Sequence, residues 1–340
     1  MISSPEHPYE KINIFTTPLT EGRNSIMYKT GDKRSVLVVP NIVKYQQQIE
    51  SPICAQLISR LNSKLMHEAE IYDKLGKCQF VTEKEADYEG LTSPLQNKIP
   101  LNGFTFKYAG VPLHSLLFPK GDERRRMVPI ARIKNTLFQI LSGLKELHDK
   151  KLVHKALSLK TIFVQFNERR EMVFKIADLA HAEIIRGVKT LIPSKTESLS
   201  YPLHYRPPEV NSRIIDHKRM RAYSFESDLW AVGCIAFELW TRAFYRDHTM
   251  EDNAVTREAI FDQNIQDIVA TAPLPKTHWK ERIKAIRPEG SAGIIKFIEK
   301  FFTFAEQRAN VEELLIMVQA IDKEGPSAAS GAFPVEEKTS

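Results

Sequence analysis

Hydrophobic residues recur along the first third of this chain with the period of strands, interrupted by one helix. The short runs SIMYKT and RSVLVVP are rich in β-prone residues and predict strands, and Pro40 closes the second run. From Gln56 to Gly76 apolar residues recur at helical spacing, which predicts one helix that ends at the glycine. Residues 77–108 return to β character around a polar stretch, TEKEADYEGLTSPLQNK, which we expect to be a loop.

From Gly110 onward the pattern becomes mainly helical. The stretch IARIKNTLFQILSGLKELHDKK carries one apolar stripe and predicts an amphipathic helix, whereas DLWAVGCIAFELW is apolar nearly all round and predicts a central buried helix. We expect strands around TIFVQF and MVFKIADL, and further helices over roughly 254–270 and 291–320. The small and polar residues of the tail predict disorder from about residue 323.

These elements predict an α+β protein of two lobes. Residues 12–107 would form a small β-rich lobe with one main helix, and residues 108–322 a larger, mainly helical lobe. Residues 1–11 are expected to be an N-terminal extension and residues 323–340 a disordered tail. The hinge between the lobes is expected near Lys107 to Gly110.

Composition narrows the function classes. The chain has 340 residues, three cysteines without a CxxC pair or a Cys/His cluster, and a net charge of +6, so neither a disulfide framework nor a zinc site is indicated. The longest apolar run, Leu229–Trp240, is too short to cross a bilayer, and the N-terminus has no apolar signal core. We expect an intracellular protein, cytoplasmic or nuclear, that does not bind a membrane.

A nucleic-acid or anionic-surface binder remains an alternative. It rests only on the mild basic balance and on the run Arg124–Arg126. Basic charge alone is not a recognition motif, so nucleic acid is not the expected partner.

Several strings stand in a fixed order in the second half of the chain. SDLWAVGCIAFELW carries Asp228, Trp230 and Gly233, YRPPEV carries Glu209, and EQRANVEELL carries Arg308. LHDKKLVHKALSLKTIFV and FKIADLA precede them. Together this order resembles the eukaryotic protein-kinase fold over nearly the whole predicted domain. The resemblance implies that Glu209 and Arg308 form an ion pair.

The resemblance also implies a set of positions for phosphoryl transfer, and most of them have lost the required side chain. Where the family has a catalytic Asp, a phosphate-contacting Lys and a metal-binding Asn, this chain has Ala156, Ser158 and Thr161. The position of the third-strand lysine falls at Val39, or at Val38 if the register slips by one. Alanine cannot accept a proton, and a neutral hydroxyl replaces an amide oxygen poorly on Mg²⁺.

Parts of a nucleotide site remain by the same resemblance. Of the three glycines in the family's glycine loop only Gly22 is kept. Phe106 aligns with the gatekeeper at the back of the nucleotide cleft, and Tyr108 follows in the hinge. Glu68 stands where the helix glutamate belongs, and without its lysine we expect it to turn to solvent or to pair with Lys44.

The family's metal-binding motif is retained only in part. In the sequence Asp178-Leu179-Ala180 the carboxylate of Asp178 could hold one cation, or it could instead cap local N–H groups. Leu179 is expected to pack against His154, which keeps its place in the loop. We expect no resident cofactor, with ATP and magnesium as the alternative.

Fold positions are thus retained beside lost reaction positions, which is the pattern of a pseudokinase. We expect a regulatory or scaffolding protein that binds another protein, for example an active kinase, with little or no phosphotransfer. The loop wording His-Lys-x-Leu-Ser also resembles the pseudokinase domain beside the active kinase of the translation-controlling amino-acid-starvation sensor. The alternative is an active but unorthodox ATP-dependent serine/threonine kinase that uses Asp178 and a relocated lysine, such as Lys44 or Lys160.

Overall fold

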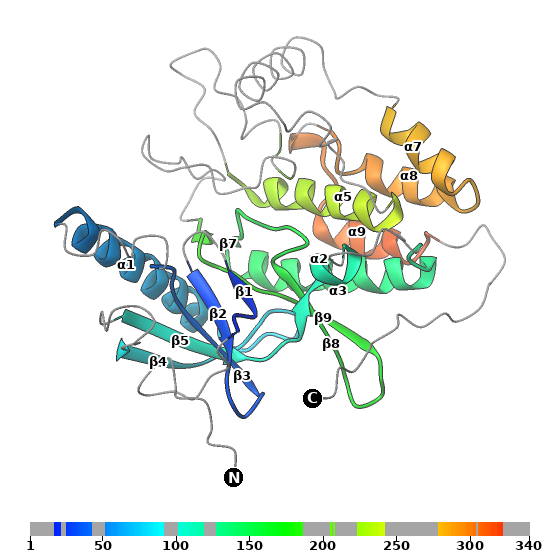
Figure 1. Ribbon diagram of the computed structural model, residues 1–340. Coiled ribbons are helices and arrows are strands. Elements are labelled where there is room, and N and C mark those ends of the chain that lie inside the picture. The colour runs from blue at the N-terminus through cyan, green and yellow to red at the C-terminus, as the bar shows by residue number, and fades with distance from the viewer. Residues whose placement is uncertain are drawn as a thin grey trace.

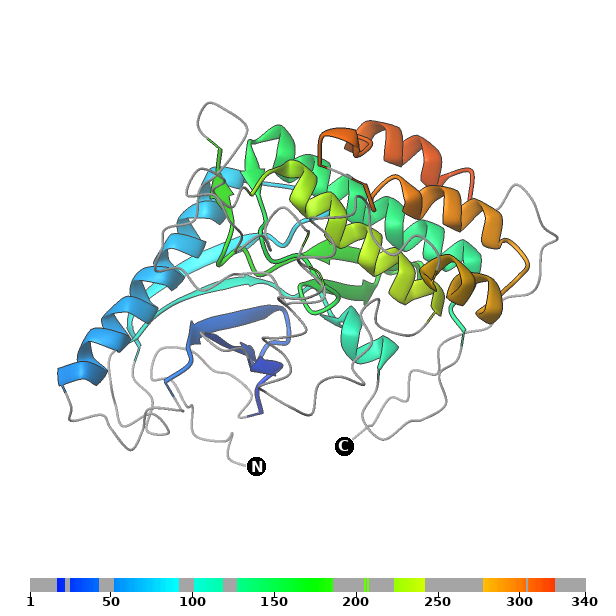
Figure 2. The same ribbon diagram turned by 90° about the horizontal axis from the view of Figure 1, so that it is seen from above.

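Two lobes make up the protein, as a computed structural model shows (Figures 1 and 2). The structure describes residues 17–21, 25–42, 52–91, 101–118, 127–185, 205, 207, 223–241, 278–303 and 305–321. Several residues and segments named above lie outside this set: Gly22, Lys44, Arg124–Arg126, Glu209, residues 1–11, the helix expected at 254–270, and the tail 323–340.

The small lobe is a five-stranded antiparallel sheet with strand order β1-β2-β3-β5-β4. Its strands are β1 (Thr20–Glu21), β2 (Ser25–Lys29), β3 (Ser35–Pro40), β4 (Lys84–Leu91) and β5 (Leu101–Lys107). The helix α1 (Pro52–Leu75) lies alongside this sheet (Figure 2). Gly76 follows it with φ 65°, a left-handed conformation that ends helices, so the predicted helix and its stop are confirmed.

The polar stretch expected to be a loop was interpreted wrongly over part of its length. Residues Lys84–Leu91 form the edge strand β4, paired with β5. Exposure alternates along its first half, but the residues there are mostly charged, so no apolar alternation marks it in the sequence. Charged residues on an edge strand discourage pairing with other chains, which accounts for this composition.

Helices dominate the large lobe. They are α2 (Leu113–Leu117), α3 (Ile130–Asp149), α5 (Phe225–Thr241), α7 (His278–Ile286), α8 (Ser291–Glu299), the 3₁₀ turn η5 (Ala305–Gln307) and α9 (Val311–Val318). The helical structure expected over 291–320 consists of α8 and α9 with the turn η5 between them, and α7 was not predicted. Within the described residues, no helix has both the length and the apolarity needed to cross a membrane.

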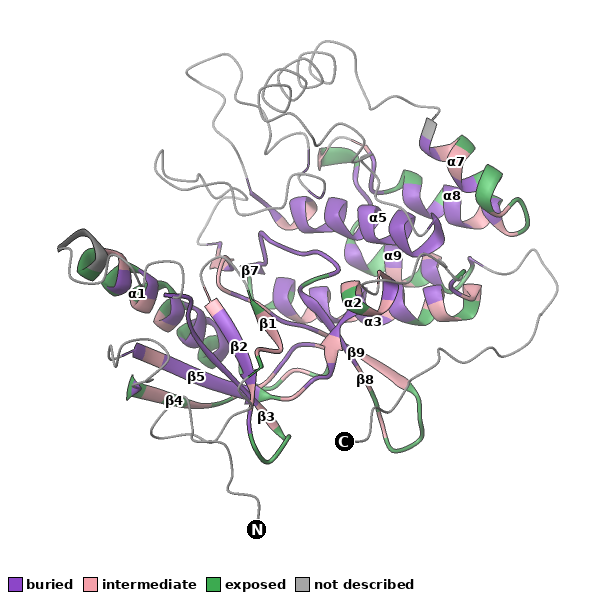
Figure 3. Cartoon of the chain, viewed as in Figure 1, coloured by how far each residue is buried: buried purple, intermediate pink, exposed green. Residues whose placement is uncertain are grey.

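Two small sheets complete the large lobe next to the small one. The strands β6 (Val111–Pro112), β8 (Ile162–Phe166) and β9 (Met172–Ile176) form one, and β7 (Leu152–Val153) pairs with β10 (Glu183–Ile184) in the other. Every residue of α5 from Ser227 to Thr241 is buried (Figure 3), as its sequence predicts.

The hydrophobic core is continuous through both lobes. One cluster joins Val36 and Phe106 of the small sheet to Phe163 of β8 and to the helices α3 and α5. The hinge passes close to this core at Gly110, where φ is 93° and a Cβ atom would lie 1.8 Å from the carbonyl oxygen of Val164. Only glycine fits there, so the hinge position is fixed by backbone contact.

Candidate functional site

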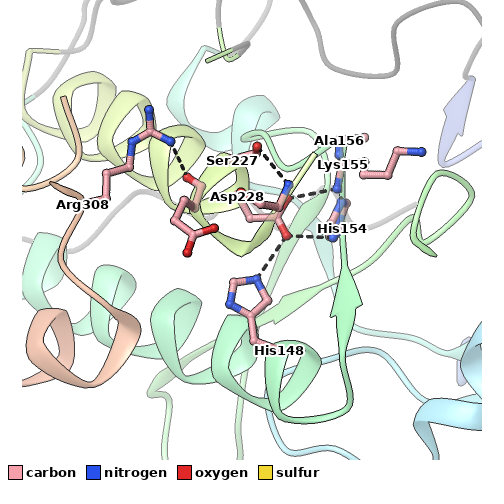
Figure 4. A network of polar contacts seen from close by, with 9 residues as sticks. His148, His154, Lys155, Ala156, Ser227, Asp228 and Arg308 are labelled. Carbon is pink, nitrogen blue, oxygen red and sulfur yellow. Dashed lines mark hydrogen bonds and ion pairs between the residues drawn. The ribbon is translucent and has the colours of Figure 1, made fainter. Parts of the chain in front are cut away.

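Asp228 of α5 anchors the loop that follows β7. Its carboxylate accepts the backbone N–H groups of His154 at 2.7 Å and Lys155 at 3.0 Å, and contacts Nε2 of His148 at 3.2 Å (Figure 4). Asp228 is completely buried, so these partners are what makes the carboxylate tolerable in the core. The loop expected from the sequence is thus held on the central helix.

His154 links this loop to the segment before Asp178. Its Nδ1 accepts the backbone N–H of Ala156 at 3.2 Å, and its Nε2 faces the carbonyl oxygen of Ala177 at 3.1 Å. These two partners assign the ring proton to Nε2, which donates to the carbonyl. Leu179 is buried in the core cluster that runs through both lobes. The imidazole ring of His154 therefore connects the loop after β7 to the segment that precedes Asp178.

Ser158 and Thr161 bond to each other and to their own loop. The Thr161 hydroxyl accepts the N–H of Ser158 at 3.0 Å and donates to the Ser158 carbonyl at 3.0 Å. The Ser158 hydroxyl accepts the N–H of Lys160 at 3.3 Å. A hydroxyl has one proton to donate, and Thr161 uses it inside the loop. Lys160 itself is exposed at the surface.

The third strand places Val38, rather than Val39, on the side of the sheet that faces Glu68. Val36 and Val38 belong to the core cluster that includes Leu65 and Ala69 of α1, which flank Glu68. Val39 belongs to a separate cluster with Ile26 and Tyr28 on the other face. Because strand residues alternate between faces, Val38, one of the two positions left open by the sequence, is the residue on the side of Glu68.

Glu68 does not turn to solvent, contrary to expectation. It is 1% exposed, and its carboxyl group accepts the backbone N–H of Leu179. Its Oε2 is buried without a hydrogen-bond partner among the described residues. Burial, and secondarily the charge of Asp178, raise the pKa of Glu68 well above its usual value. The surroundings therefore favour the neutral acid where the family has a salt bridge.

Asp178 has a left-handed backbone, with φ 62°, and a partly exposed side chain. It interacts electrostatically with Glu68 and with His181. Burial lowers the pKa of His181, and the charge of Asp178 opposes part of that shift. Among the described residues, no group of three or more His, Cys, Asp or Glu side chains gathers to hold a metal. Magnesium is usually held by one or two carboxylates together with waters and substrate phosphates, and Asp178 is the carboxylate that could contribute here, whereas the Thr161 oxygen is used inside its loop.

Lys155, in the loop after β7, makes two contacts that were not predicted from the sequence. Lys155, with its side chain 3% exposed, forms an ion pair with Glu183 of β10 at 2.7 Å. Its ammonium also lies 4.8 Å from the ring centroid of Tyr223. The ion pair ties β10 to the loop. Its partners are 28 residues apart, and single-sequence patterns carry no signal for such a pairing.

Glu146 of α3 joins the large lobe to the segment after α1. Its two carboxylate oxygens accept the backbone N–H groups of Gln79 at 2.8 Å and Phe80 at 2.9 Å. The N–H of Thr82 then donates to the carbonyl of Ile176 in β9 at 2.8 Å. Backbone donors have no sequence signature, so this contact could be found only from the structure.

Two aromatic rings meet where β5 of the small lobe faces β8 of the large lobe. Phe106 pairs with Val36 across the sheet, is 1% exposed, and meets the ring of Phe163 edge-on with 6.3 Å between centroids. Tyr108 is partly exposed, and the ammonium of Lys29 lies 3.8 Å from its ring centroid. The ring of Phe106 thus already has an aromatic neighbour in the other lobe.

Arg308 and Gly233 are packed into the base of the large lobe. Arg308 donates to the carbonyl of Glu226 at 2.8 Å, as Figure 4 shows, and its guanidinium lies 5.0 Å from the ring centroid of Trp230. A Cβ atom on Gly233 would lie 2.6 Å from Cβ of Phe301, so glycine is required there. The ion pair expected between Arg308 and Glu209 stays a prediction, because Glu209 is outside the described residues.

Comparison with known proteins defines the class. The model of the protein kinase domain matches residues 104–317, which is more than half of the chain. The chain therefore belongs to the protein kinase family, and the predicted α+β, two-lobed kinase fold is confirmed. The match begins in β5, so the smaller lobe's first strands and α1 are placed by the structure.

The curated relatives are cyclin-dependent kinases. Cyclin-dependent kinase 9-B of Xenopus laevis is 30% identical over 127 residues, 37% of this chain and 31% of that protein. Cyclin-dependent kinase E-1 of Arabidopsis thaliana is 30% identical over 136 residues, 40% of this chain and 27% of that protein. Cyclin-dependent kinase 9 of Homo sapiens is 30% identical over 114 residues, covering 34% and 28%. The chain thus matches about a third of the length of these relatives.

Proposed function

We propose that this chain is a pseudokinase, a regulatory or scaffolding protein that acts by binding another protein, with little or no phosphotransfer. The observation that carries the proposal is the state of the loop after His154. Ala156 supplies no base, and the hydroxyl proton of Thr161 is donated to the Ser158 carbonyl within the loop. The loop is therefore held in shape by its own contacts and by Asp228, and it presents no group that could position a phosphoryl acceptor.

The charges around Glu68 support the same proposal. A kinase binds the α/β-phosphates with a lysine held by the helix glutamate. Here the strand residue facing Glu68 is Val38, and burial, together with the charge of Asp178, raises the pKa of Glu68. Because Val38 carries no ammonium group, none of these three side chains supplies the positive charge that would hold a triphosphate.

The relatives support a protein partner for this chain. The matched relatives are named for dependence on a cyclin, a protein partner. We propose that this chain likewise binds a protein, for example an active kinase, inside the cell. The proposal assigns the fold's retained positions to the preservation of a binding surface.

The second candidate is an active, unorthodox kinase, favoured by one observation. Asp178 retains its carboxylate next to the buried Glu68, which is the arrangement from which a cation could be held. It requires a lysine from outside the described residues, such as Lys44, because Lys160 lies at the surface.

The test replaces the native gene with single variants in the source organism. Asp178→Asn removes the cation-holding charge while tolerating the left-handed backbone, because asparagine adopts that conformation readily. The proposal predicts the wild-type phenotype for this variant and the deletion phenotype for Asp228→Ala, which releases the loop. A deletion phenotype for Asp178→Asn, at a normal protein level, would support the active kinase instead.

A further inference from the structure

We propose that the rings of Phe106 and Phe163 fill the buried apolar space where the two lobes meet, and that this aromatic pair keeps flat heterocyclic ligands out of it. The inference goes beyond the proposed function. It concerns exclusion of the base, whereas the proposed function concerns loss of phosphate chemistry and gain of a protein partner.

The two rings belong to strands of different lobes. Phe106 belongs to β5 of the small lobe, and Phe163 belongs to β8 of the large lobe, two residues after Thr161. The two rings meet at 80°, with centroids 6.3 Å apart, the edge-to-face geometry that aromatic rings prefer. The contact therefore spans the gap between the lobes at the place that the kinase resemblance gives to the back of the nucleotide cleft.

Both rings are buried in the hydrophobic core. Phe106 and Phe163 are each 1% exposed, and Val36, which pairs with Phe106 across the sheet, is wholly buried. All three lie in the core cluster that runs through both lobes. Protein interiors are packed as densely as organic crystals, so a planar base could enter here only by displacing one of the rings.

Each ring stands on a strand that is paired on both sides. Phe163 stands in β8, which pairs with both β6 and β9, and Phe106 stands in β5 between β3 and β4. The carbonyl of Val164 lies against Gly110 of the hinge, so β8 cannot shift toward the hinge without a clash. Neither ring can swing aside cheaply, and the aromatic pair is part of the fold.

The experiment measures binding of adenosine, which carries no phosphate and therefore does not depend on Asp178, on Glu68 or on a metal. Isothermal titration is run on the full chain and on Phe163→Ala, Phe163→Leu and Phe106→Ala. Phe163→Leu opens less space but disturbs the fold less, so it keeps the test informative if the alanine variants unfold. Phe104→Ala is the matched control, because Phe104 is equally buried in β5 but packs on Tyr72 at 5.7 Å.

The expected result is no saturable binding by the wild type or by Phe104→Ala up to millimolar adenosine, and at least tenfold tighter binding by the opened variants. Wild-type binding as tight as that of Phe163→Ala would overturn the proposal. So would a folded Phe163→Leu and a folded Phe106→Ala that both fail to bind. The regulatory function would stand in either case, since it requires only that no phosphate is transferred.

Discussion

The carboxylate of Asp228 accepts the backbone N–H of His154 at 2.7 Å, across 74 residues of sequence. This contact fixes the loop that in an active kinase carries the catalytic aspartate, although here the loop carries Ala156. Asp228 thus holds this loop on the central helix α5. The account that follows from it is a kinase fold used for binding.

Asp228→Ala should destabilise the protein strongly. It leaves the buried N–H groups of His154 and Lys155 without their acceptor, and each unsatisfied buried donor costs on the order of 1–3 kcal/mol. Urea unfolding should therefore show a loss of roughly 3 kcal/mol or more. Glu226→Ala, in the same first turn of α5, is the control and should lose less than about 0.5 kcal/mol. Similar losses for both would show that the network contributes little.

Glu146→Ala should loosen the connection between the lobes without unfolding either one. Its carboxylate accepts the N–H groups of Gln79 and Phe80, so hydrogen exchange at those two amides should accelerate by about tenfold, the equivalent of 1.4 kcal/mol. Asp149→Ala is the control, because that carboxylate pairs with Lys145 at the surface. Unchanged exchange at residues 79 and 80 in Glu146→Ala would contradict this role.

Stability should fall as pH rises from about 5 to 8. Burial raises the pKa of Glu238 to about 8 from an ordinary value of 4.5, although the Tyr205 hydroxyl that donates to it at 2.5 Å acts in the opposite direction. The folded state then binds one proton more than the unfolded state across this window. The stabilisation is complete below pH 4.5 and is lost as pH rises through 8.

The variant Glu238→Gln isolates this contribution. The slope of unfolding free energy against pH should become shallower by about 1.4 kcal/mol per pH unit, the value for one proton. Glu68, whose pKa is also raised, should leave a residual slope of the same sign. Urea titrations at several pH values between 5 and 9 provide the measurement. Identical slopes for the variant and the wild type would exclude this role for Glu238.

Lysine at Val38 should be accepted far better than lysine at Val39. At Val38 the ammonium would meet Glu68, lower its pKa and reduce the loss of stability at alkaline pH. At Val39 it would be buried among apolar side chains such as Ile26 and Tyr28, with an expected loss of roughly 3 kcal/mol or more. Thermal unfolding of Val38→Lys and Val39→Lys compares the two directly. Equal destabilisation would show that neither side chain faces Glu68.

Much of the fold could be predicted because its signals are local or have fixed spacing. The apolar period of α3 and α5, and the spacing of Asp228, Trp230 and Gly233, are visible in the sequence alone. The strand β4 was missed because an edge strand faces solvent and its charged residues imitate a loop. The strand register at Val38 was left open by one residue, and only the pleat of the folded sheet distinguishes the two positions.

The positions of the motifs could be read from the sequence, but the contacts that their side chains make could not. Motif order identifies Ala156, Ser158 and Thr161, yet their mutual hydrogen bonds depend on the folded loop. The burial of Glu68 could not be predicted, because a charged residue without a partner is expected at the surface. What holds it inside is the N–H of Leu179, a backbone donor that no side-chain pattern reports.

The central claim is that this kinase fold does not transfer phosphate, and it is tested most directly by a phosphotransfer assay. Purified full-length chain is incubated with γ-labelled ATP, with Mg²⁺ or Mn²⁺ and with general protein substrates, beside Asp178→Asn. The account predicts equal, background incorporation of label for the two proteins. Incorporation by the wild type that rises with its concentration and disappears in Asp178→Asn would contradict it.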